Sequence, residues 1–277
     1  MGLRSKIEQF LKTGRNAGKE NKPDSMAVEM VCTTNTGNIR NHNEDNIAVN
    51  QIVLPIDHQS IKKPIKVQKR MDECPFAAVF DGMGGEFGGE IASYAAAKYF
   101  AAYENETPWN VGKILDLVSE MNQVVVKLGK EHRARQMGTT FSGIFCGEED
   151  VFLSNLGDSP VYRYRLGVLE EMYEAHTNEA FLKRQGINRK PGLTQFLGIY
   201  EEGMVIEPYV TRVEIEENDI FLLCSDGLTD MVEEKRICEI IEESANLTEC
   251  VQGLEMEALR NGGKDNITIL LCKVKRV

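Results

Sequence analysis

The 277-residue sequence lacks the features that mark several common classes of protein. No apolar run approaches the roughly 20 residues that a membrane-spanning helix needs, and the chain does not begin with a signal peptide. The seven cysteines are an odd number without a CxxC pair, and none of the four histidines is spaced as one of a pair of metal ligands. These absences argue against a disulfide framework and a zinc site. They favour a protein of the reducing cytoplasm.

Familiar catalytic motifs are also missing. No cysteine is followed six residues later by arginine, and neither a GxSxG nor a GxxxxGK[ST] segment occurs. This excludes the usual cysteine-based phosphatases, serine hydrolases and P-loop enzymes. The net charge of −11 leaves no surplus of lysine and arginine to neutralise phosphates, so nucleic acid is not an expected partner.

The composition that is present is that of an ordinary globular protein, with 42% hydrophobic and 27% charged residues. Residues 1–24 are basic and become polar before Pro23, so we interpret them as a mobile extension, with an amphipathic anchor or docking tail as the alternative. Residues 25–277 are long enough to form one large domain with a substantial core.

The most informative stretch is Phe76 to Gly89. The apolar run Phe76–Phe80 is typical of a strand buried on both faces, and it ends at Asp81 in a segment rich in glycine. A helix is predicted over Glu90–Tyr103. A carboxylate at the end of a buried strand is costly unless a positive group pairs with it. The alternative interpretation of Asp81 is a helix N-cap or a turn residue.

Other acids occupy similar positions next to predicted strands. An acid accompanies an apolar strand and a glycine or asparagine at several points along the chain, namely Glu44 and Asp45, Asp158, Asp226 and Asp265. Strands are also predicted over Ile47–Leu54 and Ile267–Val274, a sheet-like segment over Leu193–Gly198, and helices over Met231–Glu243 and Leu247–Arg260. The predicted strands fall into two groups separated by two consecutive helices. This order favours an α+β fold with helices laid outside sheets over alternating βαβ units.

Acids gathered at one edge of a sheet would repel one another unless divalent cations neutralised them. Ligand sets made only of oxygen suit hard ions such as Mg²⁺ or Mn²⁺. Two such ions can activate water and clamp a displacement at phosphorus. Arg40 would supply a planar, bidentate grip on phosphate oxygens. The residues themselves therefore point to metals and phosphate.

The motifs and their order resemble the metal-dependent protein serine/threonine phosphatases of the protein phosphatase 2C-like (PPM) family, and most closely its bacterial branch. The resemblance covers roughly Val28 to Val274 and rests on these segments: Arg40 with Glu44-Asp45, Val79–Gly85, Gly138-Thr139-Thr140, Gly157-Asp158-Ser159, Ser225–Asp230 and Lys264–Thr268. It implies a four-layer αββα sandwich, with two mainly antiparallel sheets flanked by helices. It also implies a single catalytic domain over residues 25–277.

The resemblance assigns roles to individual acids. Asp81 corresponds to the carboxylate that bridges two Mn²⁺ or Mg²⁺ ions, with the Gly82 carbonyl as a further ligand. Asp226 and Asp265 correspond to ligands of the first metal. The reaction implied is direct attack on phosphoserine or phosphothreonine by a hydroxide that bridges the two metals, without a phosphoenzyme.

The remaining site residues are also implied by the resemblance. Glu44 corresponds to the acid that holds the shell of the second metal, and Asp45 is its neighbour in the same motif. Asp158, together with Asp226, corresponds to a third, weaker metal site. Arg40 corresponds to the arginine that binds the substrate phosphate. The implied partners are a phosphoprotein substrate and a Ser/Thr kinase system, and the protein is expected to be a monomer.

Three positions depart from the family pattern. Met83 stands where many eukaryotic members have a histidine, so no general acid is assigned. Pro160 replaces the arginine that usually follows Gly-Asp-Ser. The segment 176–194, which begins His176-Thr177-Asn178, is shorter than the usual flap.

Two other functions remain open. A non-catalytic relative would bind phosphoprotein without cleaving it, although such relatives are expected to lose the metal acids that this chain keeps. A phosphatase for phosphoserines of the anti-sigma-factor type would use the same chemistry, and the sequence does not separate it from an antagonist of kinases. Among the histidines, His42 lies next to the acidic turn, where an exposed turn residue is the simpler interpretation.

Overall fold

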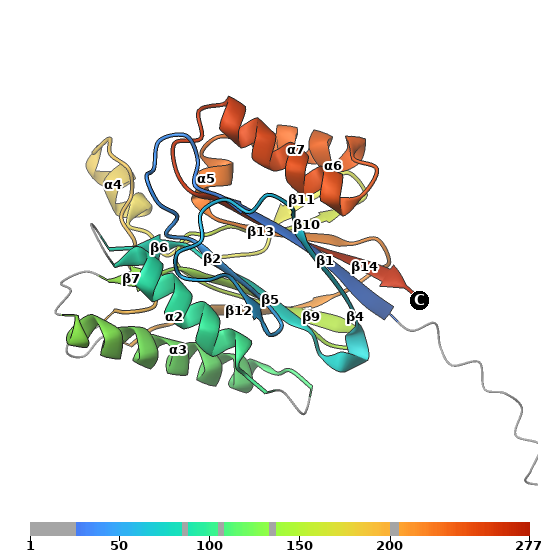
Figure 1. The fold of residues 1–277 in the computed structure, drawn as a ribbon, viewed down its shortest axis with the longest axis horizontal. Coiled ribbons are helices and arrows are strands. Elements are labelled where there is room, and N and C mark those ends of the chain that lie inside the picture. The colour runs from blue at the N-terminus through green and yellow to red at the C-terminus, as the bar shows by residue number, and fades with distance from the viewer. Residues whose placement is uncertain (1–25, 85–87, 105–107, 133–136, 200–204) are drawn as a thin grey trace, which may run out of the picture.

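The computed structural model describes residues 26–84, 88–104, 108–132, 137–199 and 205–277. The predicted basic extension, residues 1–24, lies outside the described residues. Two six-stranded sheets are stacked between two pairs of helices (Figure 1). The predicted αββα sandwich is confirmed.

Sheet A contains six strands in the order β11-β10-β13-β14-β1-β4, and every neighbouring pair is antiparallel. Its long central strands are apolar and almost entirely buried, as their sequences predict. The strands are β1 (Met26–Asn35), β4 (Ile65–Arg70), β10 (Val161–Arg165), β11 (Val168–Glu171), β13 (Ile220–Cys224) and β14 (Ile267–Arg276).

Sheet B has the order β12-β9-β8-β5-β2-β3 and is also antiparallel throughout. A separate two-stranded ribbon pairs β6 (Gly82–Met83) with β7 (Gly138–Thr139) beyond the end of β5. The strands of sheet B are β2 (Asn46–Val49), β3 (Ile52–Val53), β5 (Phe76–Phe80), β8 (Phe141–Cys146), β9 (Asp150–Leu156) and β12 (Tyr209–Glu214).

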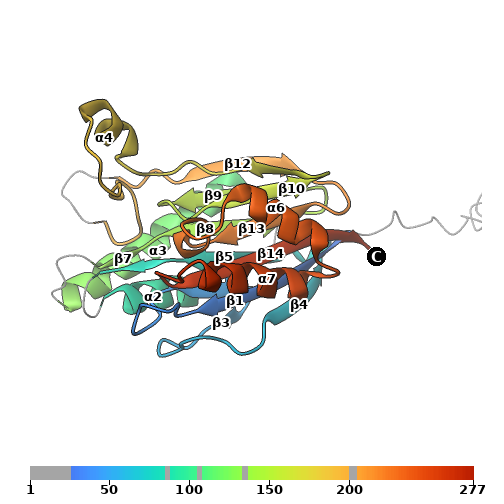
Figure 2. The same ribbon diagram turned by 90° about the horizontal axis from the view of Figure 1, so that it is seen from above.

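One helix pair covers each sheet (Figure 1), and the view from above shows α6 and α7 in front of the strands (Figure 2). Helices α2 (Gly89–Ala101) and α3 (Val111–Glu131) lie over sheet B, whereas α6 (Glu234–Glu243) and α7 (Leu247–Arg260) lie over sheet A. Each pair turns an apolar stripe toward its sheet. Within the described ranges, none of the helices combines the length and the apolar character needed to cross a membrane.

Three hydrophobic cores hold the four layers together. One lies between sheet B and its helices and contains the ring of Phe100 against those of Phe76 and Phe80. A second lies between the sheets and includes the thiols of Cys32 and Cys272. The third joins sheet A to α6 and α7. Because both faces of the central strands are buried, their sequences are continuous apolar runs.

Three sequence expectations differ from the structure. The single strand predicted over Ile47–Leu54 is split into β2 and β3 at Asn50, which adopts a left-handed conformation with φ of 49°. The helix predicted from Met231 begins only at Glu234, and a short helix α5 (Asp226–Thr229) precedes it. The sheet-like segment predicted over Leu193–Gly198 makes only isolated bridges.

The flap is the segment 176–194, and it contains the short helix α4 (Glu179–Gln185). It stands outside the sandwich at the end where β6, β7 and α5 lie (Figure 1). At the opposite end, a 3-10 turn η1 (Met71–Glu73) connects β4 to β5. The flap and the acidic strand ends therefore share one end of the molecule.

Candidate metal centre and active site

A cleft of about 300 Å³ opens between the flap and the ends of the two sheets. Most of the sequence-predicted site residues line it, although they come from segments up to 225 residues apart. The lining consists of Arg40, Glu44, Asp81, Gly82, Met83, Gly84, Thr140, Asp158, Lys190, Pro191, Leu193, Asp226 and Asp265. The fold thus gathers the acids into one site, as the sequence predicted.

Asp81 is held in the cleft by its own backbone. Its N–H donates to Thr140 Oγ1 at 3.0 Å, and its carbonyl accepts from the Thr140 N–H at 2.8 Å and from Thr139 Oγ1 at 2.9 Å. Thr140 Oγ1 also bonds Ser159 Oγ at 2.6 Å. This network joins the Asp81 strand end to the loop that carries Asp158, so the two acids keep a fixed relation.

Two glycines allow the acid-bearing segments to approach one another. A Cβ at Gly82 would lie 2.3 Å from the Glu44 carbonyl oxygen, and a Cβ at Gly227 would lie 2.0 Å from the Asn266 carbonyl oxygen. Neither distance leaves room for a side chain. The segment that carries Asp81 therefore packs directly on the one that carries Glu44, and the segment that carries Asp226 packs on the one that carries Asp265.

Asn266 fixes the turn that carries Glu44. Its Oδ1 accepts from the Glu44 N–H at 2.8 Å, while its Nδ2 donates to the carbonyls of Thr36 and His42 at 2.9 and 3.0 Å. One amide side chain from the start of β14 thus satisfies three backbone groups of the 36–44 loop. Asn266 is a positioning residue that sequence reasoning missed, because its partners are more than 200 residues away.

The acids are held in an environment that disfavours their charge. Burial, followed by repulsion from Asp45, Asp226, Asp158 and Asp265, raises the pKa of Asp81 well above its usual value. Burial raises the pKa of Asp45 to about 7 and that of Asp158 to about 6, with repulsion from Asp226 adding to both. Without bound metal, the carboxylates of the cleft cannot all stay ionised at neutral pH.

These residues fit a divalent metal centre. Oδ2 of Asp45 is buried and has no hydrogen-bond partner among the described residues, which is costly for an isolated carboxylate. The carboxylates and the Gly82 carbonyl offer a donor set made only of oxygen, as Mg²⁺ and Mn²⁺ prefer. A cation would offset the repulsion that raises the pKa of Asp81. Asp45 is 1% exposed and lies behind the lining rather than on it.

Arg40 lies at the rim of the same cleft. Its Nη2 is 2.7 Å from Asp265 Oδ2, and its side chain is 49% exposed. The ion pair holds the guanidinium beside the acids while leaving donors free to meet an incoming ligand. The arrangement suits a phosphate that must lie next to bound cations.

The flap contributes a cation that the sequence did not predict. Lys190 Nζ lies 2.8 Å from Asp226 Oδ2 and 3.1 Å from Asp230 Oδ2. Only the position of the flap above α5 brings these residues together. No local sequence signal marks a lysine in a polar segment as a partner of acids 36 and 40 residues further along the chain.

The three departures have distinct structural outcomes. Met83 lines the cleft and has no proton to donate. Pro160 lies outside the lining and accepts a backbone hydrogen bond from Cys224. His176 Nδ1 accepts from the Gly157 N–H at 3.1 Å, so it supports the loop before Asp158. Burial lowers the pKa of His176, which agrees with a neutral ring that accepts this bond.

Comparisons with known proteins identify relatives of the chain. A family model described as protein phosphatase 2C matches residues 66–261. The serine/threonine phosphatase stp of Listeria monocytogenes (serovar 1/2a) is 32% identical over 255 residues, which span 86% of this chain and 92% of that protein.

Solved structures show the same architecture. The catalytic domain of the serine/threonine protein phosphatase PstP, in complex with two manganese ions, superposes with a TM-score of 0.72 and 25% identity, covering 91% of this chain and all of that chain. The serine/threonine phosphatase of S. agalactiae gives a TM-score of 0.73 at 24% identity and covers 89% of this chain and 99% of that one. The second likeness concerns the fold alone.

Proposed function

The chain belongs to the protein phosphatase 2C family, and we propose that the cleft is the active site of a metal-dependent phosphatase that hydrolyses phosphoserine and phosphothreonine in proteins. The observation that carries this proposal is the convergence of the acids with Arg40 in one cleft. The manganese-bound PstP structure supports Mn²⁺ or Mg²⁺ as the cofactor.

Five groups of the cleft would hold two divalent cations: the carboxylates of Glu44, Asp81, Asp226 and Asp265 and the carbonyl of Gly82. Asp158 with Asp226 would provide a third, weaker position. Asp45 would support the centre from behind. Its buried Oδ2, which has no hydrogen-bond partner among the described residues, supports this role. When bound, the cations lower the pKa of coordinated water and compensate phosphoryl charge.

The protein's own groups orient the substrate. Arg40 binds two phosphoryl oxygens with its planar guanidinium and places phosphorus over the acids. Asp265 restricts the rotation of Arg40 through their ion pair. The threonine network around Asp81 keeps the central carboxylate from moving when the ligand enters. Such positioning is the main contribution a protein makes to phosphoryl chemistry.

The finer biological assignments are part of the same proposal. A Ser/Thr kinase system would produce the substrate. A cytoplasmic location is supported by seven free cysteines, five of them buried. The protein is proposed to act as a monomer. We propose that residues 25–277 form the catalytic domain and that residues 1–24 lie outside it.

The decisive experiment is hydrolysis of a phosphothreonine peptide and of p-nitrophenyl phosphate with Mn²⁺, Mg²⁺ or EDTA. The wild type should turn over both substrates only with metal, and Asp226→Asn should lose at least about 100-fold in rate. Asp116→Asn, on the exposed face of α3, is the matched control and should retain full activity. A wild type that is folded by circular dichroism and inert with every metal would instead indicate a binding protein.

A further inference from the structure

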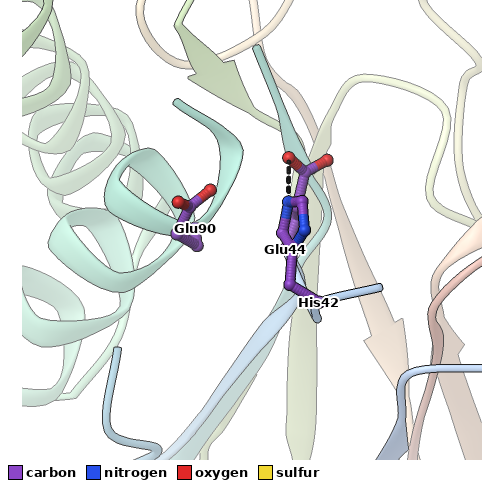
Figure 3. A group of neighbouring side chains, drawn as sticks. All are labelled: His42, Glu44 and Glu90. Atoms are coloured by element: carbon purple, nitrogen blue, oxygen red, sulfur yellow. Dashed lines mark hydrogen bonds and ion pairs between the residues drawn. The ribbon is translucent and has the colours of Figure 1, made fainter. Parts of the chain in front are cut away.

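A second group of possible metal ligands lies beside the cleft but is not part of its lining. His42, Glu44 and Glu90 each offer one ligand atom, and these three atoms lie within 4.8 Å of one another. Figure 3 shows His42 and Glu44 side by side, joined by a hydrogen bond, with Glu90 opposite on the first turn of α2. Of the three, only Glu44 lines the cleft.

Glu90 supplies an observation that points independently to a ligand. Its Oε2 is inaccessible to solvent and has no hydrogen-bond partner among the described residues. The second position of a helix favours a carboxylate through the helix dipole. That preference explains why a charged residue occurs at position 90, but it gives Oε2 no hydrogen-bond partner. Buried carboxylate oxygens normally have such a partner.

Glu44 and Glu90 face each other, with ligand atoms no more than 4.8 Å apart. His42 Nε2 lies 3.1 Å from Glu44 Oε1, and the histidine side chain is 46% exposed. Two carboxylates and one imidazole thus converge, and the group is open to solvent on the side of His42.

The backbone holds this group in place. Asn266 bonds both the His42 carbonyl and the Glu44 N–H, so the two residues are fixed relative to each other. Gly89 allows α2 to approach, because a Cβ there would lie 2.8 Å from Glu44 Cδ. The start of α2, which carries Glu90, therefore packs directly against the Glu44 side chain.

We propose that His42, Glu44 and Glu90 form a further divalent-metal site with one nitrogen and two oxygen ligands, which selects a transition metal such as Mn²⁺ over Mg²⁺. Ligand atoms about 2.1 Å from an ion lie about 3–4 Å apart, so small side-chain rotations would close the group around a cation. Imidazole favours transition metals, whereas all-oxygen sets suit Mg²⁺. The site shares Glu44 with the proposed metal centre but does not depend on phosphatase activity.

The test uses the full chain in excess Mg²⁺ with one equivalent of Mn²⁺. Pulsed electron paramagnetic resonance should detect ¹⁴N coupling to Mn²⁺ in the wild type, because His42 provides a nitrogen ligand that the cleft lacks. The coupling should disappear in His42→Gln and weaken in Glu90→Gln. It should persist in His132→Gln, which alters a histidine at the end of α3. Equilibrium dialysis should show one fewer bound Mn²⁺ in His42→Gln than in the wild type.

Three results would overturn the proposal. The first is a wild type without ¹⁴N coupling at saturating Mn²⁺. The second is coupling that survives in His42→Gln. The third is loss of coupling with unchanged Mn²⁺ stoichiometry, which would make His42 a ligand of the central ions instead. None of these readouts depends on turnover, so failure here is distinguishable from failure of the phosphatase assignment.

Discussion

Lys190 Nζ lies 2.8 Å from Asp226 Oδ2, so a flap residue pairs with an acid that is proposed to hold metal. Burial opposes the charge of Lys190, but the bonds and charges of Asp226 and Asp230 outweigh it and raise the lysine pKa. The ammonium group is therefore charged throughout the working pH range. On the proposed metal centre, it would compete with divalent cations for the Asp226 carboxylate.

Removing this competitor should increase metal affinity. We expect Lys190→Met to lower the Mn²⁺ dissociation constant by about two- to fivefold, the range that corresponds to an exposed ion pair of up to about 1 kcal/mol. Isothermal titration calorimetry would measure the change. Lys183→Met, in the same flap and paired with Glu179, should leave the affinity unaltered. Weaker Mn²⁺ binding by Lys190→Met would show that the lysine supports the site.

Arg40→Lys tests recognition of the phosphate by shape as well as charge. Lysine keeps the charge but loses the planar fork, so kcat/KM for a phosphothreonine peptide should fall by about 10- to 100-fold. Steady-state kinetics would measure this ratio. Arg212→Lys, on β12 and paired with Asp150, is the control and should match the wild type. An unchanged kcat/KM would remove Arg40 from the phosphate site.

Gly227→Ala tests the close packing of the acid-bearing segments. The new methyl would lie 2.0 Å from the Asn266 carbonyl oxygen, and overpacking of this kind costs about 1–3 kcal/mol. Chemical denaturation should report that loss in the free energy of unfolding. A Cβ at Gly192 meets nothing within 4 Å, so Gly192→Ala should be neutral. Equal stability of the two variants would contradict the packing seen here.

The metal-free protein should become less stable as pH rises from about 4 to about 7. The pKa values of Asp45 and Asp158 are raised from 3.8 to about 7 and about 6 in the fold. In this window the folded state binds more protons than the unfolded state, so stability falls with increasing pH. Urea unfolding in EDTA at several pH values would measure the slope. Asp158→Asn should flatten it, and saturating Mn²⁺ should reverse it, because protons compete with metal.

Removing the Asn266 side chain should loosen the turn that carries Glu44. Asn266→Ala leaves the Glu44 N–H and the carbonyls of Thr36 and His42 without their present partner, which costs about 1–3 kcal/mol. We expect lower stability by urea unfolding and weaker Mn²⁺ binding by calorimetry. Retention of wild-type Mn²⁺ affinity would show that the turn is held by other contacts.

The parts of the fold that could be predicted are those with strong local signals. Buried strands are predicted from the apolar residues of Phe76–Phe80 and of the last segment, which begins at Ile267. The structure confirms both strands. The α7 helix, Leu247–Arg260, has the bounds that its pattern predicts, because Asn246 caps it and an apolar stripe runs along it. The acids were found because they adjoin such strands.

The remaining features depend on contacts between distant segments. The strand predicted over Ile47–Leu54 breaks at Asn50, whose side chain accepts from the Phe76 N–H. Asp226 begins the short helix α5, which the sequence did not predict, and Gly227 in that helix packs closely on the Asn266 carbonyl. Lys190 acquires its role only when the flap folds over α5. No periodicity within a window of the chain encodes these pairings.

The inter-sheet core has a consequence for the thiol chemistry of the enzyme. Cys32, Cys146 and Cys272 lie between the sheets, and burial raises the pKa of Cys32 to about 12 and those of the other two well above their usual value. Alkylating reagents and peroxides react with thiolates. Cys224 and Cys250 are also buried, and burial raises their pKa values as well. Within the fold, reaction should therefore be fastest at the half-buried Cys74 and Cys238. The rate at which the three inter-sheet thiols are modified would therefore measure how often the two sheets separate.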